Sequence, residues 1–164
     1  MDRSPKKLSI LSLQYHCYPD EVGGAWGLTY EINKRLVSRG HEVYQITCKS
    51  SENQSSHEII DGIRYYRVSL RESKGILPLW NAIRKKIKAI LKLDPIHLIH
   101  IHNPLIGFLV LLQPSLWKIP RVYHFHSSWF DEEWINAGGI GRKSLKLKLR
   151  LEMIRIMEWM CYRF

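Results

Sequence analysis

The sequence predicts an α/β protein with a doubly wound, mostly parallel sheet and one β-hairpin. Short apolar runs typical of buried strands alternate with amphipathic runs typical of helices along most of the 164 residues, and this alternation favours parallel strands joined by crossover helices. The dipeptide Asp61-Gly62 divides the region 59–68 into two short strands, because it is a strong signal for a two-residue hairpin turn. The length suits a single domain over residues 1–164.

The remaining elements follow from apolar spacing and from glycine and proline positions. Strands are predicted at 8–13, 43–47, 98–102 and 121–125. Helices are predicted between Gly24 and Gly40 and at 80–91, 104–112 and 144–163. In the first helix, Leu28, Ile32 and Leu36 recur four residues apart, so they are expected to form the buried face.

The charge and the cysteines limit the classes of function. A net charge of +10 indicates anionic partners, but no recognition motif for nucleic acid is present, so no nucleic acid is expected. The three cysteines are widely separated and form no CxxC pair, which fits a reducing cytoplasm. The first apolar run, 8–13, is too short for a signal peptide.

Two regions raise the question of membrane contact. Residues 95–117 lack Asp, Glu, Lys and Arg, but their histidines and prolines favour a buried strand and a short buried helix over a membrane span. The basic helices at 80–91 and 144–163 allow two compatible interpretations. Each packs its apolar face on the sheet with its charges in water, and the exposed basic face also suits an anionic membrane surface.

Two predicted strands end in paired histidines, His100-x-His102 and His124-x-His126. The functional interpretations are a metal site or an acid/base pocket. The simpler interpretation, favoured for His100 and His124, is packing within the sheet with hydrogen bonds to the backbone. His102 and His126 come last in their strands, where side chains reach the crevice at the carboxyl ends of a parallel sheet. No metal is predicted, because the spacing singles out no third ligand.

Two further groups suit ligand binding. Gly23 and Gly24 lie between the first strand and the first helix, where backbone amides and a helix N-terminus favour a phosphate, although a glycine pair is also a common tight turn. They form neither the GxGxxG fingerprint nor a P-loop. The acidic run 131–133 follows Trp129 and suits a solvated first helical turn; a carboxylate beside an aromatic ring also suits a sugar hydroxyl.

Several short motifs occur in a fixed order: Gly23-Gly24, Gly40-His41-Glu42-Val43, Asp61-Gly62-Ile63-Arg64, the run 94–105, and Tyr123-His124-Phe125-His126 followed by Ser127, Ser128, Trp129 and Glu132. In this order they resemble the N-terminal, acceptor-side domain of GT-B-fold glycosyltransferases of family 4. The resemblance extends from about residue 7 to residue 164.

The resemblance implies one Rossmann-like half of a GT-B enzyme, acting as a retaining, hexosyltransferase-like transferase without a cofactor. It would move a sugar from a nucleotide-diphosphate sugar to a glycan or lipid-linked acceptor, in polysaccharide or glycolipid biosynthesis. Gly23 and Gly24 would face the donor diphosphate, and His126 would be the catalytic residue beside the transferred sugar. The acceptor side would be lined by His102, Trp129 and Glu132.

The sequence also departs from the family pattern. The second Rossmann-like domain, with the Glu-x7-Glu motif and the basic pair of the nucleotide-sugar site, is absent from residues 1–164. Ser127-Ser128 replaces the Gly-Pro of relatives with this motif. The chain alone is therefore expected to be inactive, and a C-terminal domain or a partner chain to complete it. The alternative is a non-catalytic truncated or split-subunit module, cytoplasmic and peripheral at the inner, anionic face of the membrane.

Overall fold

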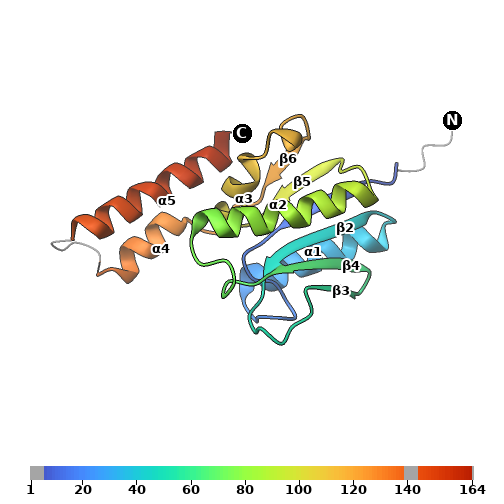
Figure 1. Ribbon diagram of the computed structural model, residues 1–164, viewed down its shortest axis with the longest axis horizontal. Helices are drawn as coiled ribbons and strands as arrows, with labels where there is room; N and C mark the ends of the chain where they lie inside the picture. Colours follow the sequence, from blue (N-terminus) through green and yellow to red (C-terminus); the bar gives the residue numbers. More distant parts are fainter. Residues whose placement is uncertain (1–5, 139–143, 164) are drawn as a thin grey trace.

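A six-stranded sheet forms the centre of the protein (Figure 1). The computed structural model describes residues 6–138 and 144–163. The strands are ordered β3-β4-β2-β1-β5-β6. Their bounds are β1 Ser9–Leu13, β2 Glu42–Cys48, β3 His57–Ile60, β4 Ile63–Val68, β5 Leu98–Ile101 and β6 Arg121–Tyr123. All neighbours pair in parallel except β3 and β4, which form the hairpin, so the predicted doubly wound sheet is confirmed.

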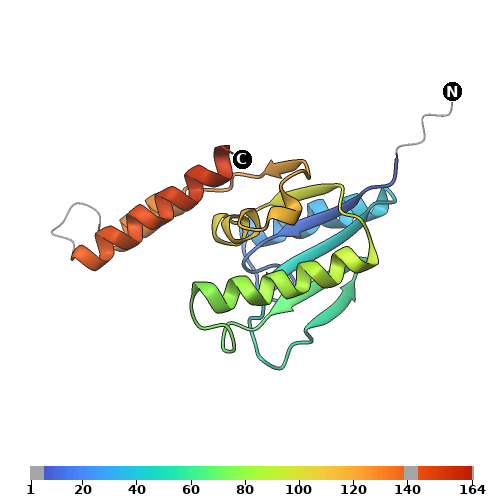
Figure 2. The same ribbon diagram turned by 45° about the horizontal axis from the view of Figure 1, so that its top comes forward.

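Helices cover both faces of the sheet (Figure 2). The helix α1, Gly24–Ser38, lies on one face, and α2, Ile76–Leu93, and α3, Pro104–Leu111, lie on the other. A short 3-10 helix, Pro114–Leu116, follows α3. The last two helices, α4 (Trp129–Asn136) and α5 (Leu145–Arg163), pack side by side and extend beyond the sheet (Figure 1).

The main hydrophobic core lies between the sheet and the two helices α2 and α3. It contains the buried side chains of β1, β2 and β5 together with Ile83, Ile87 and Leu109 from the helices. The charge-free run 95–117 accordingly folds as β5, α3 and the 3-10 helix, as expected from its histidines and prolines. Among residues 6–138 and 144–163, no helix has both the length and the apolar character needed to cross a bilayer.

The buried face of α1 differs from the prediction. Leu28, expected in the apolar stripe, is 45% exposed, whereas Thr29 and Asn33 are fully buried. The cause is the polar sheet surface beneath the helix: the Asn33 side-chain amide donates to Ser12 Oγ at 3.0 Å and to Gln45 Oε1 at 2.7 Å. These hydrogen bonds, rather than apolar spacing, set the rotation of α1, because burying Ser12 and Gln45 without partners would be costly.

The turns that the glycines predict are present. Gly40 adopts a φ of +86° after α1, where its amide donates to the Val37 carbonyl and the next amide donates to the Leu36 carbonyl. This is a Schellman ending. Asp61 and Gly62 both have positive φ, +48° and +79°, as a tight hairpin turn of this kind requires.

Candidate active site

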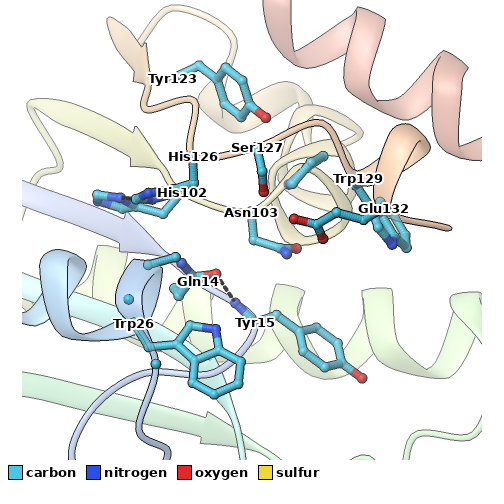
Figure 3. Close-up of a pocket in the computed structure, with 14 residues that line it drawn as sticks. Gln14, Tyr15, Trp26, His102, Asn103, Tyr123, His126, Ser127, Trp129 and Glu132 are labelled. Atoms are coloured by element: carbon cyan, nitrogen blue, oxygen red, sulfur yellow. Dashed lines mark hydrogen bonds between the residues drawn. The ribbon is translucent and has the colours of Figure 1, made fainter. Parts of the chain in front are cut away.

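A cleft of about 400 Å³ lies at the carboxyl ends of β1, β5 and β6 (Figure 3). Within the sheet, β2 pairs with one edge of β1 and β5 pairs with the other edge. The strand order therefore reverses at β1. Open α/β sheets bind ligands at such a reversal point. The residues expected to bind donor or acceptor or to act in catalysis all line this cleft: Gly23, Gly24, His102, His126, Trp129 and Glu132.

Two histidines face each other at one end of the cleft. His102 Nδ1 and His126 Nε2 are 3.2 Å apart, a hydrogen bond whose direction depends on the tautomers. Burial, together with the neighbouring histidines, lowers the pKa of His102 to about 2. Burial and the adjacent His124 also lower the pKa of His126. Both rings are therefore neutral near pH 7, each with one N–H donor and one acceptor nitrogen.

His100 and His124 complete a cluster of four histidine rings. The ring centroids of His100 and His102 are 3.9 Å apart, and those of His124 and His126 are 4.6 Å apart. His100 is 9% exposed, in agreement with the expected packing at the sheet. Within the described residues neither ring makes the expected hydrogen bond to the backbone, and the aromatic rings beside both of them are those of other histidines.

The glycine pair lies on the opposite side of the cleft. Gly23 has extended backbone and precedes α1, and Gly24 is the first helical residue. A Cβ atom on Gly24 would meet no other atom, so the helix start is open to a ligand. The first amides of any helix lack intrahelical partners, and α1 has no acidic residue in its first turn. This end of the cleft therefore suits an anion.

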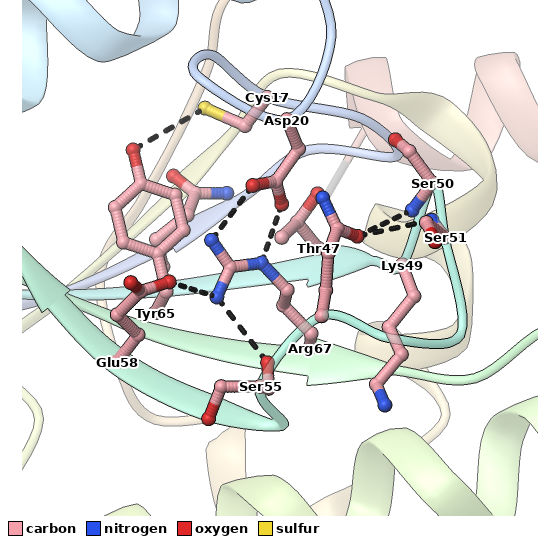
Figure 4. Close-up of polar contacts among 12 residues, drawn as sticks. Cys17, Asp20, Thr47, Lys49, Ser50, Ser51, Ser55, Glu58, Tyr65 and Arg67 are labelled. Atoms are coloured by element: carbon pink, nitrogen blue, oxygen red, sulfur yellow. Dashed lines mark hydrogen bonds and ion pairs between the residues drawn. The ribbon is translucent and has the colours of Figure 1, made fainter.

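A buried ion pair anchors the loop 14–22, which leads into the glycine pair (Figure 4). Arg67 on β4 is 2% exposed, and its guanidinium donates to both carboxylate oxygens of Asp20. It also donates to Glu58 on β3 at 2.9 Å. The Tyr65 hydroxyl donates to the Tyr18 carbonyl at 2.7 Å. The loop is thus attached to β4 at two points.

The third side of the cleft is the start of α4. Ser128 is the N-cap residue, and its hydroxyl accepts a hydrogen bond from the Asp131 amide at 3.1 Å. Glu132 lies in the first turn and its carboxylate points into the cleft (Figure 3). The second serine of the Ser127-Ser128 pair, which stands where the family pattern has proline, therefore has a structural role. Its side chain caps α4, which a proline side chain cannot do.

A glutamate from α5 holds the same turn. Glu158 is 5% exposed, and its carboxylate accepts from the Trp129 amide at 2.5 Å and from the Phe130 amide at 3.4 Å. Burial raises the pKa of Glu158, while the two amides act against that shift. An anion at a helix N-terminus is favourable, so Glu158 fixes the position of α4 and of the loop from His126 to Trp129.

The sequence analysis missed several residues of the cleft. Gln14 comes directly after β1 and Asn103 two residues after the end of β5, and these positions were an available signal. Asn103 also caps α3 by accepting from the Ile106 amide. Trp26 and Tyr15 line the cleft from α1 and from the loop 14–22. Glu158 has no local signal, because it reaches α4 from 29 residues further along the chain.

The fold is similar to solved structures titled sucrose-phosphate synthase from Thermosynechococcus elongatus. One gives a TM-score of 0.70 at 16% identity and covers 94% of this chain but 40% of that chain. Another, a shorter chain, gives a TM-score of 0.53 at 14% identity and covers 93% of this chain and 98% of that one. A comparison with curated proteins gives no match.

The architecture is therefore that of one half of a GT-B glycosyltransferase. The sequence also matches the model described as Glycosyltransferase Family 4 over residues 22–164. The chain belongs to glycosyltransferase family 4.

We expect Arg67→Met to lower the free energy of unfolding by about 3–5 kcal/mol, because it leaves the Asp20 carboxylate buried without its partner. Urea unfolding measures the change. Arg64→Met is the matched control: it removes a partly exposed pair with Glu42 and should cost about 1 kcal/mol or less. Equal losses in the two variants would contradict the role given to Arg67.

We expect Glu158→Ala to speed hydrogen exchange at the Trp129 and Phe130 amides by about 10-fold, the equivalent of one lost hydrogen bond. Exchange measured by NMR reports both amides. Glu158→Gln, which keeps one acceptor oxygen, should restore most of the protection. Glu133→Ala is the control, because it removes only an ion pair with the exposed Arg150 and should leave exchange at both amides unchanged. Equally fast exchange in this control would argue against a specific role of Glu158.

Proposed function

We propose that this chain is the acceptor-side half of a retaining glycosyltransferase that uses a nucleotide-diphosphate sugar. The observation that carries the proposal is the convergence, in one cleft, of a neutral histidine pair, a helix N-terminus and a carboxylate beside an aromatic ring. These groups match the needs of glycosyl transfer: a diphosphate anchor, polar contacts to a sugar, and a surface for the acceptor.

His126 is the catalytic residue in this proposal. Its ring is neutral and its position is set by the hydrogen bond with the buried His102. A neutral imidazole held in place stabilises charge that develops at the transferred sugar without first having to reorient. Glu132 and Trp129 bind the acceptor, since the carboxylate accepts bonds from sugar hydroxyls and the indole packs on the apolar face of a sugar ring.

The donor diphosphate requires a second half. Among the described residues that line the cleft, none is lysine or arginine. A donor diphosphate bound at the start of α1 would therefore contact backbone amides without a cationic side chain from this cleft beside it. We propose that a second Rossmann-like domain or a partner chain supplies those cations and the nucleotide site, and that this chain alone is inactive.

We expect His126→Ala to reduce transfer by about 100-fold or more once the nucleotide-sugar half is supplied, because it removes the group beside the reacting sugar. A panel of nucleotide-diphosphate sugars, with release of the nucleoside diphosphate as the readout, measures the loss. NMR of the product tests retention of the anomeric configuration.

His57→Ala, on the exposed strand β3, is the matched control and should keep full turnover. Circular dichroism of both variants confirms folding. Unchanged turnover in a folded His126→Ala protein would reject the catalytic assignment, and an inverted product would reject retention.

A contact with an anionic membrane surface is a second proposal, supported by α5. This helix exposes an apolar series along its length: Leu145, Leu149, Met153, Ile156, Trp159 and Tyr162. Lys146 and Lys148 are exposed on the same helix. Exposed apolar side chains beside lysines suit the headgroup region of an anionic bilayer, which would bring a lipid-linked acceptor close to the cleft.

We expect the protein to sediment with vesicles of phosphatidylglycerol and phosphatidylcholine, less at high salt, and not with phosphatidylcholine alone. Leu149→Ser and Ile156→Ser should each weaken binding by about 10-fold, because each removes apolar surface from the bilayer. Ile59→Ser, equally exposed on β3, should have no effect. Binding that is insensitive to both α5 variants would reject this surface.

A further inference from the structure

Three of the clustered histidines meet the geometric requirement for a shared ligand. One ring nitrogen from each of His100, His102 and His124 lies within 4.8 Å of the other two. His100 is on β5 and His102 follows it two residues later, on the same face. The parallel register pairs Ile101 with Tyr123, which places His124 beside His102. The sheet itself therefore brings the third histidine to the pair, although nothing in the sequence spacing singles it out.

The buried member of the cluster has an unused nitrogen. His102 is 3% exposed, its Nδ1 is paired with His126, and its Nε2 is buried without a hydrogen-bond partner. Buried polar nitrogens are nearly always paired, so an unpaired one calls for a specific explanation. A ligating imidazole usually has its second nitrogen hydrogen-bonded to a fixed neighbour, and the bond to His126 fits that pattern.

We propose that His100, His102 and His124 bind a divalent transition-metal ion, with Zn²⁺ as the best fit. Three imidazole nitrogens suit zinc and its neighbours and do not suit magnesium or calcium, which require oxygen ligands. A tetrahedral site with zinc–nitrogen distances of 2.0–2.1 Å places its nitrogens about 3.3 Å apart. In the structure the three nitrogens lie within 4.8 Å of one another, so binding requires the rings to turn toward a common point.

The metal site lies behind the cleft rather than in it. His102 lines the cleft, whereas His100 and His124 do not. The fourth coordination position is left to a water molecule. A bound ion would tie the end of β5 to the segment after β6 and fix the ring of His102. The site requires no assumption about glycosyl transfer, so it stands or fails separately from the proposed function.

The test is a titration of EDTA-treated, dialysed protein with ZnCl₂ in an isothermal calorimeter. We expect one ion per chain, and a rise in the melting temperature that grows with free zinc. Co²⁺ as a second probe should give the intense visible absorption of a four-coordinate site. His100→Asn and His124→Asn should each weaken binding by about 100-fold or more, because each removes a ligand directly.

His57→Asn is the matched control, since His57 is exposed on β3 and remote from the cluster. It should bind zinc as the unaltered chain does. The proposal is overturned if the unaltered chain binds no stoichiometric zinc, or if His57→Asn loses as much affinity as the cluster variants. Circular dichroism of the metal-free variants separates lost ligands from lost fold. Should His100→Asn fail to fold, His124→Asn decides, because the His124 side chain is only partly buried.

Discussion

The ion pair between Arg67 and Asp20 is the constraint on which the glycine side of the cleft, Gly23 and Gly24, depends. The loop 14–22 has no strand or helix of its own and must carry Gly23 and Gly24 to the end of β1. Arg67 is almost completely buried, so its charge cannot be solvated and must be satisfied by Asp20 and Glu58. A buried charge tolerates few arrangements. The loop is therefore held in one position, and α1 starts where an anion can reach it.

Around this anchor, the cleft is assembled from segments that are distant along the chain. β1, β5 and β6 end at the same edge of the sheet because they are parallel, and each supplies polar residues just past its last hydrogen-bonded position. The histidine side and the glycine side are attached to different strands. The loops that line the cleft on these two sides are each tied to the fold, one by Arg67 and the other by Glu158.

Local chemistry explains what could be predicted from the sequence. The strands, the hairpin at Asp61-Gly62 and the helix ending at Gly40 depend on neighbours a few residues away, and all are present, although β5 ends at Ile101 and β6 at Tyr123, before the predicted ends at 102 and 125. That His102 and His126 would reach the crevice at the carboxyl ends of the strands followed from their places in the sequence, whereas their contact with each other was not predicted. Their roles, and those of the glycines, Trp129 and Glu132, remain predictions.

The rest could not be predicted because it depends on contacts across the fold. The buried face of α1 is set by Ser12 and Gln45 on the sheet, and apolar spacing alone pointed to Leu28 instead. The approach of His124 to His102 requires the register of β5 with β6. Glu158 acts on α4 from a separate helix, and no pattern near either segment reveals it.

The contact made by Glu158 joins the outer surface of the molecule to the cleft. One side of α5 carries the exposed apolar series, while another side carries the carboxylate that holds the amides of Trp129 and Phe130. A shift of α5 along its own axis would withdraw that carboxylate and release the turn that positions Glu132. Any contact that moved α5 from its outer face would therefore also displace Glu132, without itself entering the cleft.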